Sequence, residues 1–483
     1  MVTFVSQKTT QEKEVHYENG YALKGSTLVV PLPEPLKVSH QIVVNGDHCN
    51  SLPANDVLTE EEKLDAEWNV RACPAAIEST NPIRELLESL CVVSSKKKEK
   101  ISLAQGDPTA FGHLKVPDAA VEAMVAATKS YMCNGYTHSA GSHECRKAVA
   151  DYHSSSLPIK LTADDVGITV GCSQAIQLCI AALATTGANI LIPRPGFPIY
   201  ETFCKYYGVA CRFYDLLPER DWEVDLDQIT VLADSNTVAW IVCNPSNPCG
   251  SVYKYQHLMK IANTAEKLKV PLISDEIYAN MVFGPTEFTP MAAFSLKVPV
   301  LTVGGISKRW LAPGWRLGWI IIADPKGILS RGKVVEALTR LMQMTIGTST
   351  LSQAAVSGML LNTPSSFFED TIKSLKAGAE LCFDRVQRIK GLHCPTKPQG
   401  AMYIMVRIDP AVFKDIRSDV EFASLLVEEE SVVVLPGTAF GTPNWLRIVF
   451  ATPQALLEEA WDRIDIFCLR HSASIPYTGT ELY

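Results

Sequence analysis

Between about residues 116 and 325 the apolar positions form short runs of strand length, separated by amphipathic stretches of helical length. The runs predict strands at residues 166–170, 189–192, 237–243, 270–274, 300–303 and 317–322. The stretches between them predict helices, among them residues 119–127, 173–183 and 255–268. Short apolar strands that alternate with helices are typical of a parallel or mostly parallel sheet with helices on both faces. The pattern therefore predicts a large α/β domain over residues 116–326.

The pattern changes after about residue 327. Helices are predicted at 327–345, 365–389 and 455–469, and short strands at 402–406 and 446–450. This mixture predicts an interdomain helix and a smaller α+β domain over residues 327–475, followed by a tail at 476–483. We expect residues 68–115 to join the small domain.

Residues 1–67 differ from the rest of the chain. Short Val-rich pieces at 28–30 and 42–44 alternate with polar clusters, and several prolines interrupt any helical pattern. Proline ends or breaks a helix. We therefore expect an N-terminal extension that is partly disordered.

Composition narrows the class of protein. The 483 residues are 47% hydrophobic and 20% charged, which is typical of a soluble globular protein of about two domains. The formal net charge of -8 argues against nucleic acid or an anionic membrane surface as a partner. The 14 cysteines form no C-x-x-C pair, which fits a reducing compartment better than a disulfide framework. No apolar window reaches membrane-spanning length, and the first residues show no targeting pattern. We expect a cytoplasmic protein, without a metal site because His138 and His143 have no partners at a metal-ligand spacing.

In an open α/β sheet, ligands bind at the carboxyl ends of the strands. The predicted strand 166–170 leads through Gly171 into Ser173 and Gln174 at the start of a helix. A helix start offers unpaired backbone N–H groups and a partial positive charge, which suit a phosphate group. The alternative is an ordinary turn in which Ser173 is the helix N-cap.

Polar residues also follow the next strands. Residues 244–248 contain two Asn-Pro pairs, which stiffen a loop and direct an amide side chain, that of Asn247, outward. The alternative is a plain turn, because Asn-Pro is common in turns. Asp275 ends the strand 270–274. A desolvated carboxylate needs a partner, and the protonated nitrogen of a pyridine ring is one. The alternative for Asp275 is a helix N-cap.

Lys308 leaves the strand 300–303 through a Gly-Gly pair, and Arg316 lies eight residues further on, before the next strand. Most lysines are solvated surface residues. A lysine between two buried strands, with a lowered pKa, forms Schiff bases.

These residue types match the needs of one cofactor. Pyridoxal phosphate requires a phosphate cradle, an anion for its ring nitrogen, a donor for its phenolic oxygen, a stacking face and a lysine. Ser173, Gln174 and Arg316 are the candidates for the phosphate cradle, and Asp275 is the candidate anion for the ring nitrogen. Asn247 and Tyr278 are the candidate donors to the phenolic oxygen, Phe197 is the candidate stacking face, and Lys308 is the candidate lysine.

Three segments carry a family resemblance: residues 244–250, 274–278 and 304–319. They resemble the class I, fold-type-I aminotransferases, in the branch that holds tyrosine aminotransferases, nicotianamine aminotransferases and cystine-lyase-like members. The similarity covers about residues 68–470. It implies a large domain with a mostly parallel, seven-stranded-type sheet and a smaller α+β domain.

The resemblance implies a role for each candidate. Lys308 carries the Schiff base and moves the proton between substrate and cofactor. Asp275 keeps the pyridine nitrogen protonated. Tyr278 and Asn247 bind the phenolic oxygen, and Ser307 belongs to the cofactor-binding motif.

Further positions follow from the same resemblance. The ring of Phe197 stacks on the cofactor, and Tyr136 reaches the phosphate of a neighbouring subunit, which implies a homodimer with shared sites. Arg447 clamps the substrate α-carboxylate, a pairing that its planar guanidinium favours. Gly106 and Asn247 lie against the substrate, although Gly106 is equally well explained as a plain turn. His138 stands where the family pattern has proline, in a stretch that the resemblance places near the mouth of the active site.

The activity expected on these grounds is ping-pong transamination of aromatic L-amino acids, with L-tyrosine and 2-oxoglutarate giving 4-hydroxyphenylpyruvate and L-glutamate. Two alternatives keep the cofactor, namely a C–S lyase of the cystine-lyase kind and a nicotianamine aminotransferase. A catalytically silent scaffold is disfavoured because every catalytic position is intact. A nicotinamide oxidoreductase is disfavoured because no G-x-G-x-x-G follows a predicted strand.

Overall fold

The computed structural model describes residues 70–92 and 98–473. The chain divides into the units Met1–Val70 and Arg71–Tyr483, and every element described below belongs to the second unit. The predicted N-terminal extension (1–67), with its Val-rich pieces, and the predicted tail (476–483) lie outside the described residues.

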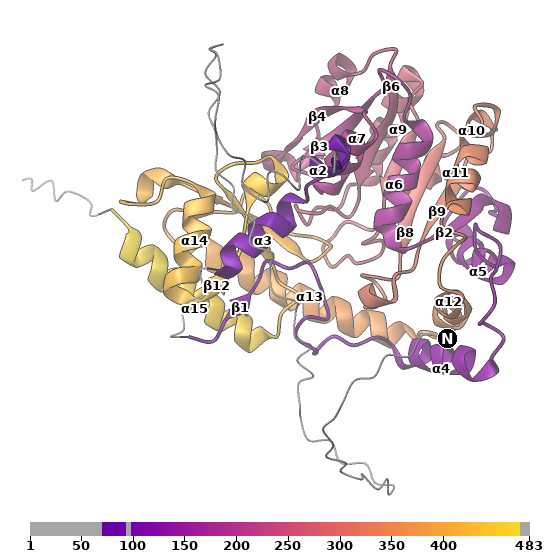
Figure 1. Cartoon of the computed structure of the whole chain (residues 1–483). Coiled ribbons are helices and arrows are strands. Elements are labelled where there is room, and N and C mark those ends of the chain that lie inside the picture. Colours follow the sequence, from indigo (N-terminus) through magenta and orange to yellow (C-terminus); the bar gives the residue numbers. More distant parts are fainter. Residues whose placement is uncertain (1–69, 93–97, 474–483) are drawn as a thin grey trace, which may run out of the picture. The chain divides into compact units, whose positions relative to one another are not determined.

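The largest sheet has eight strands among the described residues (Figure 1). Their order across the sheet is β2 (Val166–Thr169), β9 (Gly318–Ala323), β8 (Val300–Gly305), β7 (Leu272–Asp275), β6 (Thr237–Cys243), β3 (Asn189–Arg194), β4 (Ala210–Leu217) and β5 (Glu223–Val224). Only β9 and β5 run against the other six. The predicted mostly parallel sheet is confirmed, with one strand more than the family pattern suggested.

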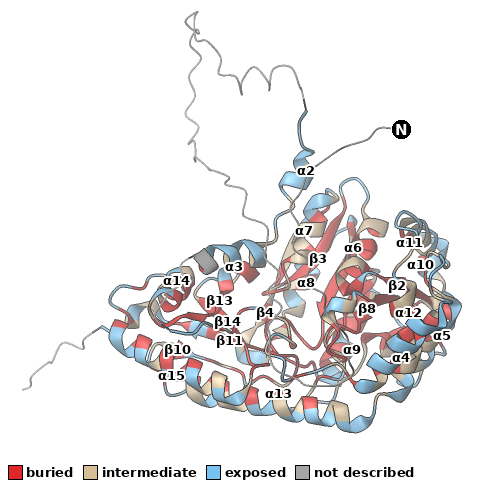
Figure 2. Ribbon diagram, turned by 60° about the horizontal axis from the view of Figure 1, so that its bottom comes forward, coloured by how far each residue is buried: buried red, intermediate tan, exposed pale blue. Residues whose placement is uncertain are grey.

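Helices cover both faces of this sheet because alternate residues of each strand point to opposite faces. Trp240 and Val242 of β6 share a core with Leu258 and Ile261 of α9 (Tyr255–Leu268). The intervening strand residues pack instead against α6 (Gly171–Leu183), α7 (Ile199–Tyr206) and α11 (Val334–Gln343). Figure 2 shows the strands as buried and the outer helix faces as exposed.

A second sheet has four antiparallel strands, β10 (Leu392–His393), β11 (Tyr403–Ile408), β14 (Trp445–Val449) and β13 (Leu435–Pro436), in that order. Three helices pack with it: α13 (Ser365–Val386), α14 (Asp419–Glu430) and α15 (Gln454–His471). The chain after residue 98 joins this region, since β1 (Ile101–Ser102) pairs in parallel with β12 (Val432–Val433). The remaining α-helices among the described residues are α2 (Pro74–Ile77), α3 (Pro82–Val92), α4 (Asp118–Ser130), α5 (His143–Ser154), α8 (Leu226–Leu232), α10 (Ile328–Arg331) and α12 (Thr350–Asn362).

Two of the elements that differ from the sequence prediction have a clear physical reason. The helix expected over 327–345 is broken, because Lys333 has a left-handed backbone (φ 60°) between α10 and α11. Strand β4 was not predicted, because Arg212 and Asp215 interrupt its apolar pattern; both form ion pairs, with Asp234 and Arg194 respectively. Among the described residues no helix is long and apolar enough to cross a membrane.

Candidate functional site

The carboxyl ends of the parallel strands bring the predicted residues together. Asp275 is the last residue of β7, the segment with Asn247 follows β6, and Lys308 follows β8. Because β6, β7 and β8 are adjacent and parallel, these three side chains come from neighbouring strand ends.

Asp275 is a buried carboxylate (3% exposed) without an ion pair among the described residues. Its Oδ2 accepts a hydrogen bond from the Tyr200 hydroxyl at 2.6 Å, and its Oδ1 accepts from the backbone N–H of Ile277 at 3.2 Å and from Cys172 Sγ at 3.7 Å. Burial raises the pKa of Asp275, while these hydrogen bonds and the charge of Lys308 oppose the rise. Residues 277–280 form a turn, so the N-cap alternative is wrong.

The side chain of Lys308 is half-buried, and its Nζ donates a hydrogen bond to the Gly106 carbonyl. The same nitrogen lies 5.9 Å from the centre of the Tyr278 ring. Lys308 is therefore turned toward other predicted site residues, and the surface-lysine alternative does not describe it. Ser307, one residue earlier, is buried.

The start of α6 has the features that a phosphate group needs. The N-cap residue is Val170, and no side chain caps the helix, so Ser173 is not the N-cap. The Arg316 guanidinium lies against this turn, with Nη2 donating to the Val170 carbonyl at 3.3 Å. Gly171 has a φ of +72°, and a Cβ there would lie 2.4 Å from Arg316 Nη2. Gln174 already accepts a hydrogen bond from the backbone N–H of Val170 at 2.7 Å.

Arg447 lies in β14 and is 2% exposed, so the surface ion-pair alternative is wrong. Its Nη1 donates to Asn247 Oδ1 at 3.1 Å and its Nη2 to the Ala104 carbonyl at 2.6 Å, whereas its Nε has no partner among the described residues. Burial lowers the pKa of the guanidinium. A buried cation without an anion costs several kcal/mol, which is the condition expected of a binding site for a carboxylate.

Phe197 and Tyr136 occupy different surroundings. Phe197 follows β3, is half-buried, and packs edge-on against Tyr200 with ring centres 5.9 Å apart. Tyr136 is 90% exposed and lies in the loop after α4. Within the described part of this single chain, Tyr136 is not brought into the site.

Two site residues were missed by sequence reasoning. Tyr200 donates to Asp275, and Tyr403, at the start of β11, shares a hydrogen bond of 2.6 Å between its hydroxyl and that of Tyr278. Both are buried aromatic residues in ordinary apolar segments. Only the position of Tyr200, three residues after Phe197, gave a signal.

The residues present fit pyridoxal phosphate. The uncapped α6 start with Arg316 suits its phosphate, the unpaired Asp275 suits a protonated ring nitrogen, and Lys308 is an amine near both Gly106 and Tyr278. Among the described residues no group of three or more His, Cys, Asp or Glu side chains could hold a metal ion.

The strand order and the two-sheet arrangement place the chain in the fold-type-I class, and comparison with solved structures agrees. The tyrosine aminotransferase structure from Leishmania infantum superposes with a TM-score of 0.79 at 37% identity, covering 84% of this chain and 99% of that one. Residues 98–464 match the family model of aminotransferase class I and II. The chain belongs to this family and is an aminotransferase.

Two curated relatives show which branch the chain resembles. Tyrosine aminotransferase of Bos taurus is 44% identical over 425 residues, covering 88% of this chain and 94% of that protein. Nicotianamine aminotransferase 1 of Oryza sativa subsp. japonica is 42% identical over 376 residues, covering 78% of this chain and 76% of that protein. The resemblance drawn from the three motifs is therefore confirmed.

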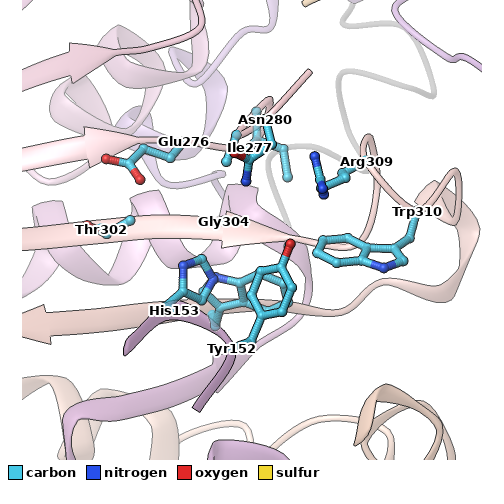
Figure 3. A pocket seen from close by; sticks show the side chains of 12 residues that line it. Tyr152, His153, Glu276, Ile277, Asn280, Thr302, Gly304, Arg309 and Trp310 are labelled. Atoms are coloured by element: carbon cyan, nitrogen blue, oxygen red, sulfur yellow. The ribbon is translucent and has the colours of Figure 1, made fainter. Parts of the chain in front are cut away.

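A second buried carboxyl group, Glu276, follows Asp275 in the chain (Figure 3). Its Oε1 accepts hydrogen bonds from Ser274 Oγ and from the backbone N–H of Met291, each at 2.8 Å. Burial raises the pKa of Glu276 to about 7; the Asp275 charge adds to the rise, and the two hydrogen bonds oppose it.

Exchanging Glu276 for glutamine should change how the free energy of unfolding depends on pH. The unfolded carboxyl loses its proton near its ordinary pKa of 4.5, whereas the folded one keeps it up to about pH 7. The wild type should therefore lose about 3 kcal/mol of stability as the pH rises from about 4.5 to about 7, and Glu276→Gln should not. Urea unfolding across this pH range measures the difference. Parallel stability curves would contradict the raised pKa.

Proposed function

We propose that the chain binds pyridoxal phosphate and transfers the amino group of aromatic L-amino acids, above all L-tyrosine, to 2-oxoglutarate by a ping-pong mechanism. The observation that carries the proposal is Arg447, a buried guanidinium whose Nε is unpaired and which has no carboxylate partner within residues 70–92 and 98–473. A substrate α-carboxylate supplies that partner. The rings of Tyr403 and Phe440 lie 4.4 and 4.9 Å from its Cζ, so apolar aromatic surface adjoins the carboxylate position.

Each residue has a proposed task. Arg447 and Asn247 hold the substrate carboxylate, with Gly106 against the substrate, and Lys308 moves the proton at the substrate Cα. Asp275 keeps the ring nitrogen of the cofactor protonated, and the bound cofactor supplies an electron sink. Tyr278 and Asn247 donate to the phenolic oxygen. Ser173, Gln174, Ser307 and Arg316 hold the phosphate end, and Phe197 provides the stacking face.

The alternatives differ in the amino donor or in the fate of the β-substituent. The similarity to the Oryza sativa relative supports nicotianamine as an alternative amino donor. A C–S lyase is the other alternative, because its reaction and transamination both begin with removal of the proton from the substrate Cα. The test compares kcat/KM for L-tyrosine, nicotianamine and L-cystine with 2-oxoglutarate present. We expect tyrosine to be preferred and L-glutamate to form. Release of pyruvate and ammonia from cystine, without glutamate from tyrosine, would reject the proposal.

Asp275→Asn should lower kcat by about 100-fold or more, because the asparagine keeps the shape but loses the charge that pairs with the ring nitrogen. Steady-state kinetics with L-tyrosine measures the loss. Glu276→Gln is a matched control, since it makes the same carboxyl-to-amide exchange at the adjacent buried position, and we expect near wild-type turnover from it. Wild-type rates in Asp275→Asn would reject the proposed role.

A homodimer with shared sites is part of the proposal. Large apolar side chains are exposed in the loop after α4 and in the loop after α11: Tyr131, Met132, Tyr136, Met344 and Ile346. The two loops lie side by side, because a Cβ on Gly347 would lie 3.4 Å from the Ser139 carbonyl oxygen, and Thr350 Oγ1 at the start of α12 donates to the Cys133 carbonyl. Exposed apolar patches mark interaction surfaces, and a second copy of the chain is the occupant that the homodimer requires.

Mixing two inactive variants tests the shared site. If Tyr136 serves the neighbouring subunit, a heterodimer of Lys308→Ala and Tyr136→Ala contains one site with both changes and one intact site. Refolding the two variants together should restore about a quarter of the wild-type activity, the share expected from random pairing. No recovery, in a sample shown by light scattering to be dimeric, would mean that Tyr136 acts within its own subunit.

We also propose a cytoplasmic location. The support is the use of cysteine. Of the twelve cysteines whose surroundings the structure describes, nine pack in apolar cores, Cys243 is buried at the end of β6, and none forms a disulfide, as in reducing compartments. Imaging of a tagged protein tests the location, and an organellar signal would reject it.

A further inference from the structure

Tyr403 contacts several residues of the proposed site but has no task in the proposed function. It begins β11, is 2% exposed, and lies 44 positions before Arg447 in the chain. Its ring centre is 4.4 Å from Arg447 Cζ, and its hydroxyl is 2.6 Å from the Tyr278 hydroxyl. Tyr403 thus touches both the residue proposed for the substrate carboxylate and one proposed for the cofactor.

The Tyr403 hydroxyl also determines what can stand at position 106. A Cβ on Gly106 would lie 2.4 Å from the Tyr403 hydroxyl oxygen and 3.3 Å from Cζ of its ring. The Gly106 carbonyl in turn accepts the hydrogen bond from Lys308 Nζ. A side chain at position 106 would therefore have to displace the Tyr403 hydroxyl, a constraint that a plain turn does not explain.

We propose that Tyr403 is a positioning residue that links the Arg447 carboxylate clamp to Tyr278. Its ring face supports the desolvated guanidinium, an attraction that is larger when the cation is buried. Its hydroxyl donates to the Tyr278 oxygen, which polarises the Tyr278 O–H and makes it a stronger donor toward the cofactor. The inference rests on the proposed function, because both partners of Tyr403 take their roles from it.

A tyrosine that merely fills the core should be replaceable by phenylalanine without effect on the site. If Tyr403 instead strengthens the hydrogen bond that the Tyr278 hydroxyl donates, phenylalanine at position 403 should change the site. The two cases differ in the visible absorption band of the holoenzyme, whose pH midpoint depends on hydrogen bonds to the cofactor oxygen. Weaker donation by Tyr278 leaves more electron density on the cofactor and raises the midpoint.

The first experiment titrates the visible band of the purified holoenzyme against pH. Tyr403→Phe should raise the midpoint by about half a pH unit, Tyr278→Phe should raise it further, and the double variant should match Tyr278→Phe alone. Tyr214→Phe is the control, since it removes a buried hydroxyl that donates to the Ile241 carbonyl at 2.7 Å in a different core. An unchanged midpoint in Tyr403→Phe, with a shift in Tyr278→Phe, overturns the link. If the wild type shows no titrating visible band, the proposed function fails as well.

Kinetics separates the ring from the hydroxyl. Tyr403→Leu should raise KM for L-tyrosine about tenfold with a smaller change in kcat, because Arg447 loses an aromatic face. Tyr403→Phe should leave KM near its wild-type value. Equal KM values for the two variants would overturn the assignment of the ring to the clamp.

A rescue experiment tests the same contact without reference to the cofactor spectrum. Gly106→Ala should lower the melting temperature and the activity, because its methyl group meets the Tyr403 hydroxyl. Adding Tyr403→Phe removes the oxygen and should recover part of both losses. If the double variant is no better than Gly106→Ala, the hydroxyl is not what requires glycine.

A separate observation concerns a small cavity beside the loop that carries Lys308 (Figure 3). Its volume for the centre of a water molecule is about 10 Å³, near the minimum for one bound water. Five of the residues that line it each have a buried polar atom without a partner among the described residues: His153 Nε2, Thr302 Oγ1, Arg309 Nε, Trp310 Nε1 and Trp319 Nε1. Unpaired buried polar groups in native proteins usually have a water as partner.

We infer that this cavity binds one ordered water molecule, which satisfies Arg309 next to Lys308 and at least one of the tryptophan N–H groups. A crystal structure of the holoenzyme at a resolution that shows interior waters should contain a water there with two to four hydrogen bonds. In Trp319→Phe and Thr302→Val the water should have weaker density. An empty cavity in the wild type, with other interior waters visible, would overturn this inference.

Discussion

Replacing Lys308 with alanine should lower turnover by about 10⁴-fold while leaving the protein folded and able to bind pyridoxal phosphate non-covalently. Lys308 is the only amine that the proposal assigns to proton transfer at the substrate Cα, and a positioned group of this kind contributes up to about 10⁴-fold. The fold should persist because the side chain is only half-buried and its hydrogen bond is to one backbone carbonyl, that of Gly106. Turnover with L-tyrosine, thermal melting and cofactor retained after gel filtration measure the three effects.

Lys326→Ala serves as the control for Lys308→Ala. Lys326 is an exposed lysine in the turn before α10, so its loss should change neither turnover nor cofactor binding. Near-normal activity in Lys308→Ala would remove the basis of the site assignment.

Replacing Arg447 with leucine should lower kcat/KM for L-tyrosine by about 100-fold or more, mainly through KM. The guanidinium would make two charge-assisted hydrogen bonds to the substrate carboxylate, each worth about 1.5–3 kcal/mol, and leucine makes neither. For an amine without a carboxylate, such as tyramine, kcat/KM should fall much less, because tyramine makes no hydrogen bond through a carboxylate to Arg447. Steady-state kinetics on the two substrates measures the ratio.

Arg407→Leu is the matched control for Arg447→Leu. Arg407 lies on β11, the strand paired with β14, but is exposed. Its replacement should leave both substrates unaffected. Equal losses on L-tyrosine and tyramine in Arg447→Leu would mean that Arg447 supports the fold of the site rather than gripping a carboxylate.

The sequence predicted the large sheet well because its central strands are buried on both faces and read as unbroken apolar runs. Strand β6 begins and ends at the predicted residues, and so does α9. Strand β4 escaped prediction because its charged side chains are paired with residues outside the strand, which only the fold reveals. The break at Lys333 escaped because nothing in the sequence forces its left-handed backbone.

The candidate site was predictable where residue type alone signals chemistry. An aspartate, a lysine and an arginine at strand ends or within buried strands are unusual, and Asp275, Lys308 and Arg447 drew attention for that reason. Tyr403 and Tyr200 did not, because a buried tyrosine is ordinary until its hydroxyl partner is known. Tyr403 lies 125 positions from Tyr278 in the chain, so no local pattern connects them.

The most direct test of the account is a single half-reaction. Purified holoenzyme is mixed with L-tyrosine in the absence of any oxo acid, and both the visible spectrum and the products are followed. Ping-pong transamination should give about one molecule of 4-hydroxyphenylpyruvate per active site, after which the reaction stops until 2-oxoglutarate is added. Absence of 4-hydroxyphenylpyruvate, together with continuous release of pyruvate and ammonia from L-cystine, would contradict it and make the chain a C–S lyase.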